Sequence, residues 1–80
     1  MKLRDAIEAW LVTPGNSLQG LADQSGVQRE ALSRYRSGSR GLSMNNIRLL
    51  DRFFGGRIDV RQAMDEMAEM SSQRTGSGAA

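Results

Sequence analysis

The 80-residue sequence contains no cysteine and no histidine, and these two absences exclude much chemistry. Without cysteine there is neither a disulfide framework nor a thiolate metal site. Without histidine the most common metal ligand and the usual general base are missing too. No spacing of the carboxylates suggests a catalytic pair. The sequence therefore predicts a protein that is not an enzyme and that uses no metal or other cofactor.

Long apolar runs are also absent. No stretch approaches the roughly 20 consecutive apolar residues that cross a bilayer. The first ten residues, MKLRDAIEAW, contain acids where a secretory signal would be apolar. We therefore expect a cytoplasmic protein that does not associate with membranes. Eighty residues suffice for one domain with a modest core, and neither an internal repeat nor a second domain is evident.

Lysine is almost absent, because Lys2 is the only one among eleven basic residues. A GC-rich genome would explain arginine in place of lysine. It would not explain why seven arginines lie between residues 28 and 57 with only two acids among them. The segments on either side carry a small negative charge. This segregation is typical of a surface that faces a polyanion.

The single proline and most of the glycines mark boundaries between amphipathic segments. Apolar residues at helical spacing predict helices over 2–12, 18–25, 28–37, 44–54 and 60–71. Ser17 and Ser43 are suitable caps for the second and fourth helices, and Gly26 supplies the positive φ that a helix end favours. No segment alternates with period two. We predict a compact all-α fold of five helices, with Met44, Ile47, Leu50 and Phe54 facing inward in the fourth.

The second and third of these helices are separated only by a short break at Ser25-Gly26. Such a break lets two short helices meet at a steep angle, with Val27, Leu32 and Tyr35 fixing the second on the body. The segment SLQGLADQSGVQREALSRYRSGSRGLSMNNIRLLDRFF resembles the lambda-repressor-like (Cro/repressor, XRE-type) helix-turn-helix proteins. The shared features are Leu21-Ala22, Gly26-Val27, the inward Leu32 and Tyr35, the loop SGSRGLS and the apolar series that follows it.

The resemblance implies roles for the polar residues around the helix-turn-helix unit, residues 17–38. Its base-reading positions correspond to Gln28, Arg29, Ser33 and Arg34. Arg29 is the preferred reader, because its planar fork can donate two hydrogen bonds to guanine. Gln28 either reads adenine or caps the helix, and Glu30 either accepts from cytosine or orients Arg34 four residues later. The expected phosphate contacts are Ser17, Gln19, Arg36, Ser37, Arg40, Ser43 and Asn45; capping and turn formation are the alternative roles of the serines.

Small readers of this kind usually act as dimers on pseudo-palindromic sites. The apolar stripe Val60, Met64, Met67 and Met70, on a helix over about 59–71, is the candidate dimer interface. Alternatively, it only covers the core of its own chain.

We expect a DNA-binding domain over 1–70 and a disordered tail over 71–80. The predicted function is that of a homodimeric transcriptional repressor of phage, plasmid or prophage type that binds double-stranded DNA, with no small-molecule ligand. The alternatives are an antitoxin-type autoregulator with a protein partner, and an interaction module that does not bind DNA.

Overall fold

Five helices follow one another in the computed structural model, which describes the backbone of residues 1–79 and the side chains of residues 1–71. They are α1 (Leu3–Val12), α2 (Leu18–Ser25), α3 (Arg29–Ser37), α4 (Met44–Phe53) and α5 (Val60–Ala79), and no strand occurs in the described backbone. The predicted all-α class is confirmed. The first four helices match their predicted limits to within one residue at each end.

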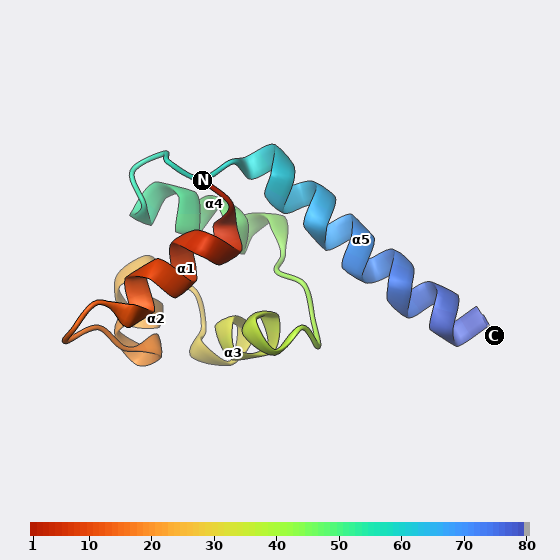
Figure 1. Cartoon of the computed structure of the whole chain (residues 1–80), viewed down its shortest axis with the longest axis horizontal. Helices are drawn as coiled ribbons and strands as arrows, with labels where there is room; N and C mark the ends of the chain where they lie inside the picture. Colours follow the sequence, from red (N-terminus) through yellow and green to blue (C-terminus); the bar gives the residue numbers. More distant parts are fainter. Residues whose placement is uncertain (80) are drawn as a thin grey trace.

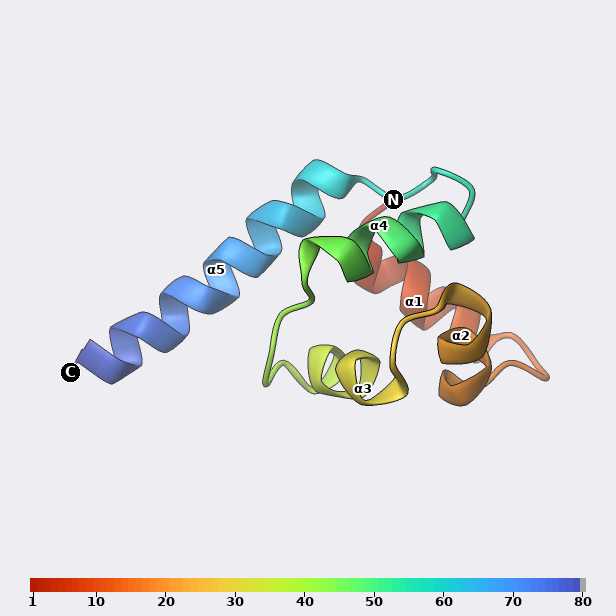
Figure 2. The same cartoon turned by 180° about the vertical axis from the view of Figure 1, so that it is seen from behind.

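The first four helices form a body, and α5 leads away from it toward one end of the molecule (Figures 1 and 2). Helix α2 packs against α3 and α4, while α5 packs against α4 and α1. The chain's first residue is attached to the start of α5. There the Asp59 amide donates to the Met1 carbonyl at 2.8 Å, and the Met1 amino group donates to the Arg57 carbonyl at 3.2 Å. The entry to α5 is thus fixed on the body.

Polar side chains and glycines set the helix ends, as the sequence predicts. The Ser17 hydroxyl accepts from the Gly20 amide at the start of α2, and the Ser43 hydroxyl accepts from the Asn46 amide at the start of α4. Each bond pairs an amide that a helix N-terminus leaves without a partner. Gly38 ends α3 in the left-handed conformation, with φ at 79°. Local chemistry therefore accounts for these boundaries.

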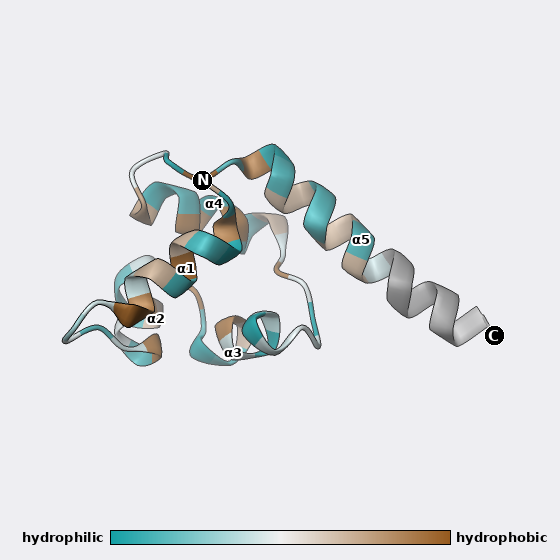
Figure 3. Ribbon diagram, viewed as in Figure 1, coloured by the Kyte–Doolittle hydropathy of each residue, from teal (hydrophilic) through white to brown (hydrophobic). Residues whose placement is uncertain are grey.

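The core lies where the inner faces of the five helices meet, and every helix of the body carries both polar and apolar residues (Figure 3). One prediction is wrong: Met44 is 36% exposed rather than inward-facing. Met44 is the first residue of α4, and Leu42, which precedes the helix, is buried in the core instead. The buried apolar residues are Leu3, Ala6, Ile7, Leu21, Ala22, Val27, Leu32, Tyr35, Leu42, Ile47, Leu50, Ile58 and Ala63.

The break between α2 and α3 depends on three consecutive residues. Gly26 adopts a left-handed backbone with φ at 87°, which turns the chain out of α2. Val27 then enters the core with 1% of its surface exposed. The hydroxyl of buried Ser25 accepts from the Val27 amide at 3.2 Å, so that the turn leaves this donor paired. The hydrogen bond within the turn therefore explains why position 25, although buried, is a serine.

We expect Gly26→Ala to lower the free energy of unfolding by about 1 kcal/mol, since a left-handed backbone disfavours any residue with a Cβ atom. Steric conflict contributes nothing, because the nearest atom to an added Cβ is Leu49 Cδ1 at 4.0 Å. Denaturant titration measures the loss. Gly26→Asn is the control and should lose less, because asparagine tolerates this conformation better. Equal stabilities for wild type and Gly26→Ala would contradict the left-handed turn.

Helix α5 is 20 residues long and continues as far as Ala79. The sequence predicts its end near residue 71 and a disordered tail over 71–80; in the structure the backbone is helical to Ala79, and residue 80 lies outside the described residues. Each residue added to an existing helix gains a backbone hydrogen bond without a new nucleation step. The polar composition of this segment predicts only that it lacks a buried face, and it does not determine the backbone conformation.

Candidate nucleic-acid interface

Helix α3 is held on the body by one face and exposes the other. Leu32 and Tyr35 are fully buried, whereas the four predicted base-contacting residues are exposed. Gln28 stands at the N-cap position without a side-chain cap bond, which leaves its amide group available. Arg29 begins the helix, and its side chain has no hydrogen bond or ion pair within the described part of the chain. Ser33 and Arg34 follow on the same helix, and their side chains are exposed too.

Glu30 and Arg34 form an ion pair along α3. The Arg34 Nη2 atom lies 2.6 Å from Glu30 Oε1, one helical turn apart. This geometry confirms that Glu30 can orient Arg34, one of its two predicted roles. Both side chains remain largely exposed, so the pair contributes little to stability. Its effect is to hold the guanidinium close to the helix surface.

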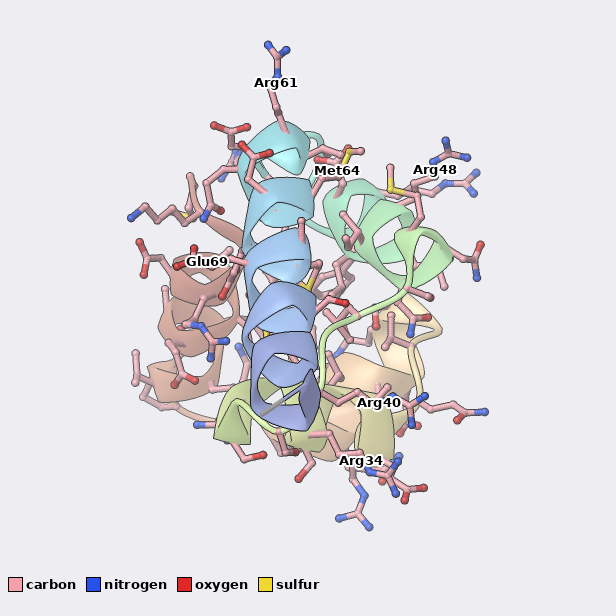
Figure 4. All side chains as sticks on the ribbon, turned by 90° about the vertical axis from the view of Figure 1, so that its right-hand side faces the viewer. Arg34, Arg40, Arg48, Arg61, Met64 and Glu69 are labelled. Carbon is pink, nitrogen blue, oxygen red and sulfur yellow. The ribbon has the colours of Figure 1, made fainter. Side chains whose placement is uncertain are left out.

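A hollow of about 260 Å³ lies between α3 and the start of α4. It brings together Gln28 and Arg34 from the predicted base-reading set with Arg40 and Ser43 from the predicted phosphate-contacting set. In the view of Figure 4, Arg34 and Arg40 lie near the lower edge and Arg61 lies at the upper edge. The complete lining is Gln28, Glu30, Ala31, Arg34, Arg40, Gly41, Ser43 and Asn46.

The lining of the hollow includes two guanidinium groups, Arg34 and Arg40, against one carboxylate, Glu30. The Arg40 side chain is exposed and has no partner among the described residues. The N-terminus of α4 adds backbone amides and a partial positive charge. Asn46 lines the hollow, whereas Asn45, the residue predicted to contact phosphate, is exposed and is not part of the lining. The arrangement suits an anion with several acceptor oxygens.

Three other predicted phosphate contacts are exposed but already take part in local bonds. The side-chain amide of Gln19 donates to the Asp23 carboxylate at 2.8 Å, on the outer face of α2. The Ser37 hydroxyl donates to the Arg34 carbonyl at 2.9 Å, beside the end of α3. Ser17 caps α2, as described above. None of the three lines the hollow. Capping and turn formation therefore account for Ser17 and Ser37.

Arg36 turns away from the hollow to α1. Its Nε and Nη2 atoms lie 2.8 and 3.1 Å from the two oxygens of Glu8, which makes a bidentate pair between α3 and α1. The hydrogen bond holds the pKa of Glu8 below its ordinary value of 4.5 and raises that of Arg36. A phosphate contact by Arg36 would have to replace or share this carboxylate. This competition could not be predicted from local sequence patterns, because the two residues are 28 positions apart.

We expect Glu8→Gln to strengthen binding to any duplex DNA severalfold at neutral pH, because it releases the Arg36 guanidinium. The same change should destabilise the fold by less than about 1 kcal/mol, since the pair is half-exposed. Glu8 has a lowered pKa in the folded state. Its contribution to stability is therefore present above the unfolded pKa and is lost as the pH falls through the folded one.

Two measurements check this prediction. Denaturant titrations from pH 7 to pH 3 should show the stability difference between wild type and Glu8→Gln closing as Glu8 becomes protonated. Filter binding should show the gain in DNA affinity. Asp65→Asn removes an acid from an exposed side chain of α5 that does not contact Arg36, so it reports the general effect of one charge. An equal gain in Asp65→Asn would contradict a specific release of Arg36.

A cluster that sequence analysis missed joins α1, α3 and α5. Arg4 Nε lies 3.0 Å from Glu66 Oε2, and the Tyr35 hydroxyl donates to Glu66 Oε1 at 2.6 Å. The Arg4 guanidinium also stacks on the Tyr35 ring, 4.3 Å from its centre. Burial and the Glu66 carboxylate raise the pKa of Tyr35 well above its ordinary value, so the hydroxyl stays a donor. No sequence signal indicated the cluster, because its members are 31 and 62 residues apart.

The predicted dimer stripe on α5 is divided between the core and the surface. Val60, Met67 and Met70 are partly buried against the core, while Met64 is 48% exposed. Met67 also accepts a hydrogen bond from the Leu42 amide through its sulfur, at 3.1 Å. The stripe thus covers part of its own chain's core, as the alternative interpretation proposed. Beside it, a groove of about 590 Å³ is lined by Met67 and Met70 on one side and residues 40–43 on the other.

Among the described residues, no helix has both the length and the apolar character needed to cross a membrane. Comparison with known proteins adds no identification: no family model, no curated protein and no solved structure matches the chain.

Proposed function

We propose that the chain is a sequence-specific DNA-binding regulator of the lambda-repressor-like helix-turn-helix class. The observation that supports this most is the exposed face of α3, with an unpaired Arg29, next to the hollow that Arg34, Arg40 and Ser43 share. Helices α2 and α3, joined through the left-handed Gly26, form the helix-turn-helix unit. Helix α3 is the recognition helix and enters the major groove, which is about 12 Å wide.

Binding uses two kinds of contact. Arg29, Gln28, Ser33 and Arg34 read base edges, while Arg40, Ser43 and the N-terminus of α4 hold the sugar-phosphate backbone and set the register. Two copies related by a two-fold axis read a pseudo-palindromic operator, with exposed Met64 at the centre of the α5 contact between them. Repression is steric, because a protein bound across a promoter excludes the polymerase.

Selection from a random-sequence duplex pool, followed by sequencing at two salt concentrations, tests the proposed function. We expect an enriched palindrome with half-sites about one helical turn, roughly 34 Å, apart. Retention should fall steeply as salt increases, since each neutralised phosphate contributes nearly one unit of log–log slope. A salt-sensitive pool without an enriched motif would contradict sequence-specific reading. No retention at either salt concentration would overturn DNA binding altogether.

A protein partner is the second candidate function, and the groove between α5 and residues 40–43 is the feature that favours it. Leu42, Met67 and Met70 give the groove an apolar side, and methionine adapts well to varied partners. In the antitoxin version the same chain binds both DNA and the partner. In the version without DNA, binding to the partner would be insensitive to salt and no duplex would be retained at either salt concentration, which distinguishes it from both other functions.

A further inference from the structure

The C-terminal end of α3 is held by side chains from two other helices. Arg4 of α1 donates to the Tyr35 carbonyl at 3.2 Å and to the Arg36 carbonyl at 3.4 Å. These are carbonyls of the last turn of α3, where a helix lacks internal donors and carries partial negative charge. The Arg4 guanidinium supplies hydrogen-bond donors to these carbonyls and a positive charge beside the negative end of the helix. Arg4 thus caps α3 from outside.

Glu66 links the same end of α3 to α5. One of its oxygens accepts from the Tyr35 hydroxyl at 2.6 Å, and the other pairs with Arg4 Nε at 3.0 Å. Helix α5 packs mainly on α4 and α1. The Glu66–Tyr35 bond is therefore a connection between α5 and α3 that does not depend on helix packing. Since the acceptor is charged, it is among the stronger hydrogen bonds in the molecule.

The cluster leaves little freedom for α3 to tilt. Tyr35 is fully buried, with its ring covered by the Arg4 guanidinium and its hydroxyl bonded to Glu66. Rotation of α3 about its own axis would break the hydroxyl bond. A tilt at its C-terminal end would break the Arg4 bonds to the carbonyls. A helix moves as a rigid element. The contacts at the C-terminal end of α3 therefore also restrict the movement of its outer face, one to two turns away.

We propose that Arg4, Glu66 and Tyr35 are positioning residues for DNA reading, and that α5 sets the orientation of α3 through Glu66. The role in DNA reading rests on the proposed function. The restraint on α3 itself is present in the free protein, without DNA. A contact that moves α5 would then alter base reading without touching DNA. None of the three residues needs to contact the duplex.

The test compares four variants with wild type. Tyr35→Phe removes only the hydroxyl, Glu66→Ala removes the whole acceptor, and Glu66→Gln keeps an acceptor oxygen for Tyr35 but loses the charge that pairs with Arg4. Glu69→Gln is the matched control, because it removes one charge from an exposed side chain of α5 that has no bond to α3. Affinities are measured for a duplex recovered by selection and for its scrambled version. Amide hydrogen exchange of residues 33–37 is measured without DNA.

We expect Glu66→Ala to reduce the ratio of selected to scrambled affinity about tenfold, the scale of one hydrogen bond to a charged group. Tyr35→Phe should do nearly the same, and Glu66→Gln should restore part of the loss. Exchange over residues 33–37 should accelerate in the same order. A variant that merely unfolds more often would lose both affinities equally, since the unfolded chain binds neither duplex.

Two results would overturn the positioning role: an unchanged affinity ratio in Glu66→Ala and Tyr35→Phe, or a ratio that falls as much in Glu69→Gln. If wild type prefers no duplex, the proposed sequence-specific function fails, and the exchange measurement alone then decides. Wild-type exchange over residues 33–37 in both Tyr35→Phe and Glu66→Ala would show that the cluster does not restrain α3.

Discussion

Arg29→Ala should reduce affinity for the selected duplex roughly tenfold to a hundredfold, the cost of about 1–3 kcal/mol for one bidentate base contact. The scrambled duplex should lose far less, because a base reader adds little to the electrostatic affinity that every sequence shares. Arg29 is the first residue of α3, its side chain is exposed, and it has no partner among the described residues. Its guanidinium is thus available at the start of α3, where the resemblance to helix-turn-helix proteins implies a base reader. Titration of both duplexes at one fixed salt concentration measures the two losses.

Arg61→Ala is the matched control for Arg29→Ala. Both variants remove one exposed guanidinium, but Arg61 is on α5 and lies at the edge opposite Arg34 and Arg40 in the view of Figure 4. We expect Arg61→Ala to lower both affinities slightly and equally, through net charge alone. A similar loss in the two variants would mean that Arg29 acts only through its charge. A loss confined to Arg61→Ala would place the DNA on another face.

Local signals were sufficient to predict the first four helices, because each of their boundaries depends on residues close in sequence. Ser17, Gly26, Gly38 and Ser43 stop or start a helix through their own backbone or hydroxyl chemistry, so their effect is visible without tertiary structure. The same is true of the Glu30–Arg34 pair, which needs only one turn of helix. The exposure of the predicted base-reading residues follows from the burial of Leu32 and Tyr35 on the opposite face of α3.

Contacts between distant segments could not be predicted in this way. Periodicity indicates that a helix has an inner face, but not which neighbour receives each polar side chain at the edge of that face. The resemblance implies a phosphate contact for Arg36, yet its side chain pairs with Glu8 of α1. Arg4 is a polar residue of α1, and nothing near it in the sequence indicates that it caps α3. Met44 has the right spacing for the core, but its place at the start of α4 leaves it exposed.

Leu32→Ala should cause the largest loss of stability, about 2–5 kcal/mol, since it removes a fully buried side chain and leaves a cavity. That is a large share of the roughly 5–15 kcal/mol by which small domains are stable. Leu32 lies on α3 and belongs to the same core cluster as Leu21 of α2 and Leu50 of α4. Truncating it weakens the packing of α3 against the other helices. Denaturant titration followed by circular dichroism measures the shift in midpoint.

Val12→Ala is the control for the truncation of Leu32, because Val12 ends α1 with 77% of its surface exposed and should change stability by less than about 0.5 kcal/mol. The Leu32 variant also distinguishes a loss of folding stability from a loss of sequence-specific DNA binding. Above the midpoint of its unfolding, affinity for selected and scrambled duplexes should fall together, because only the folded fraction changes. Well below the midpoint, any remaining loss confined to the selected duplex would come from a displaced α3. A stability loss under about 1 kcal/mol in Leu32→Ala would contradict the burial of α3 on this core.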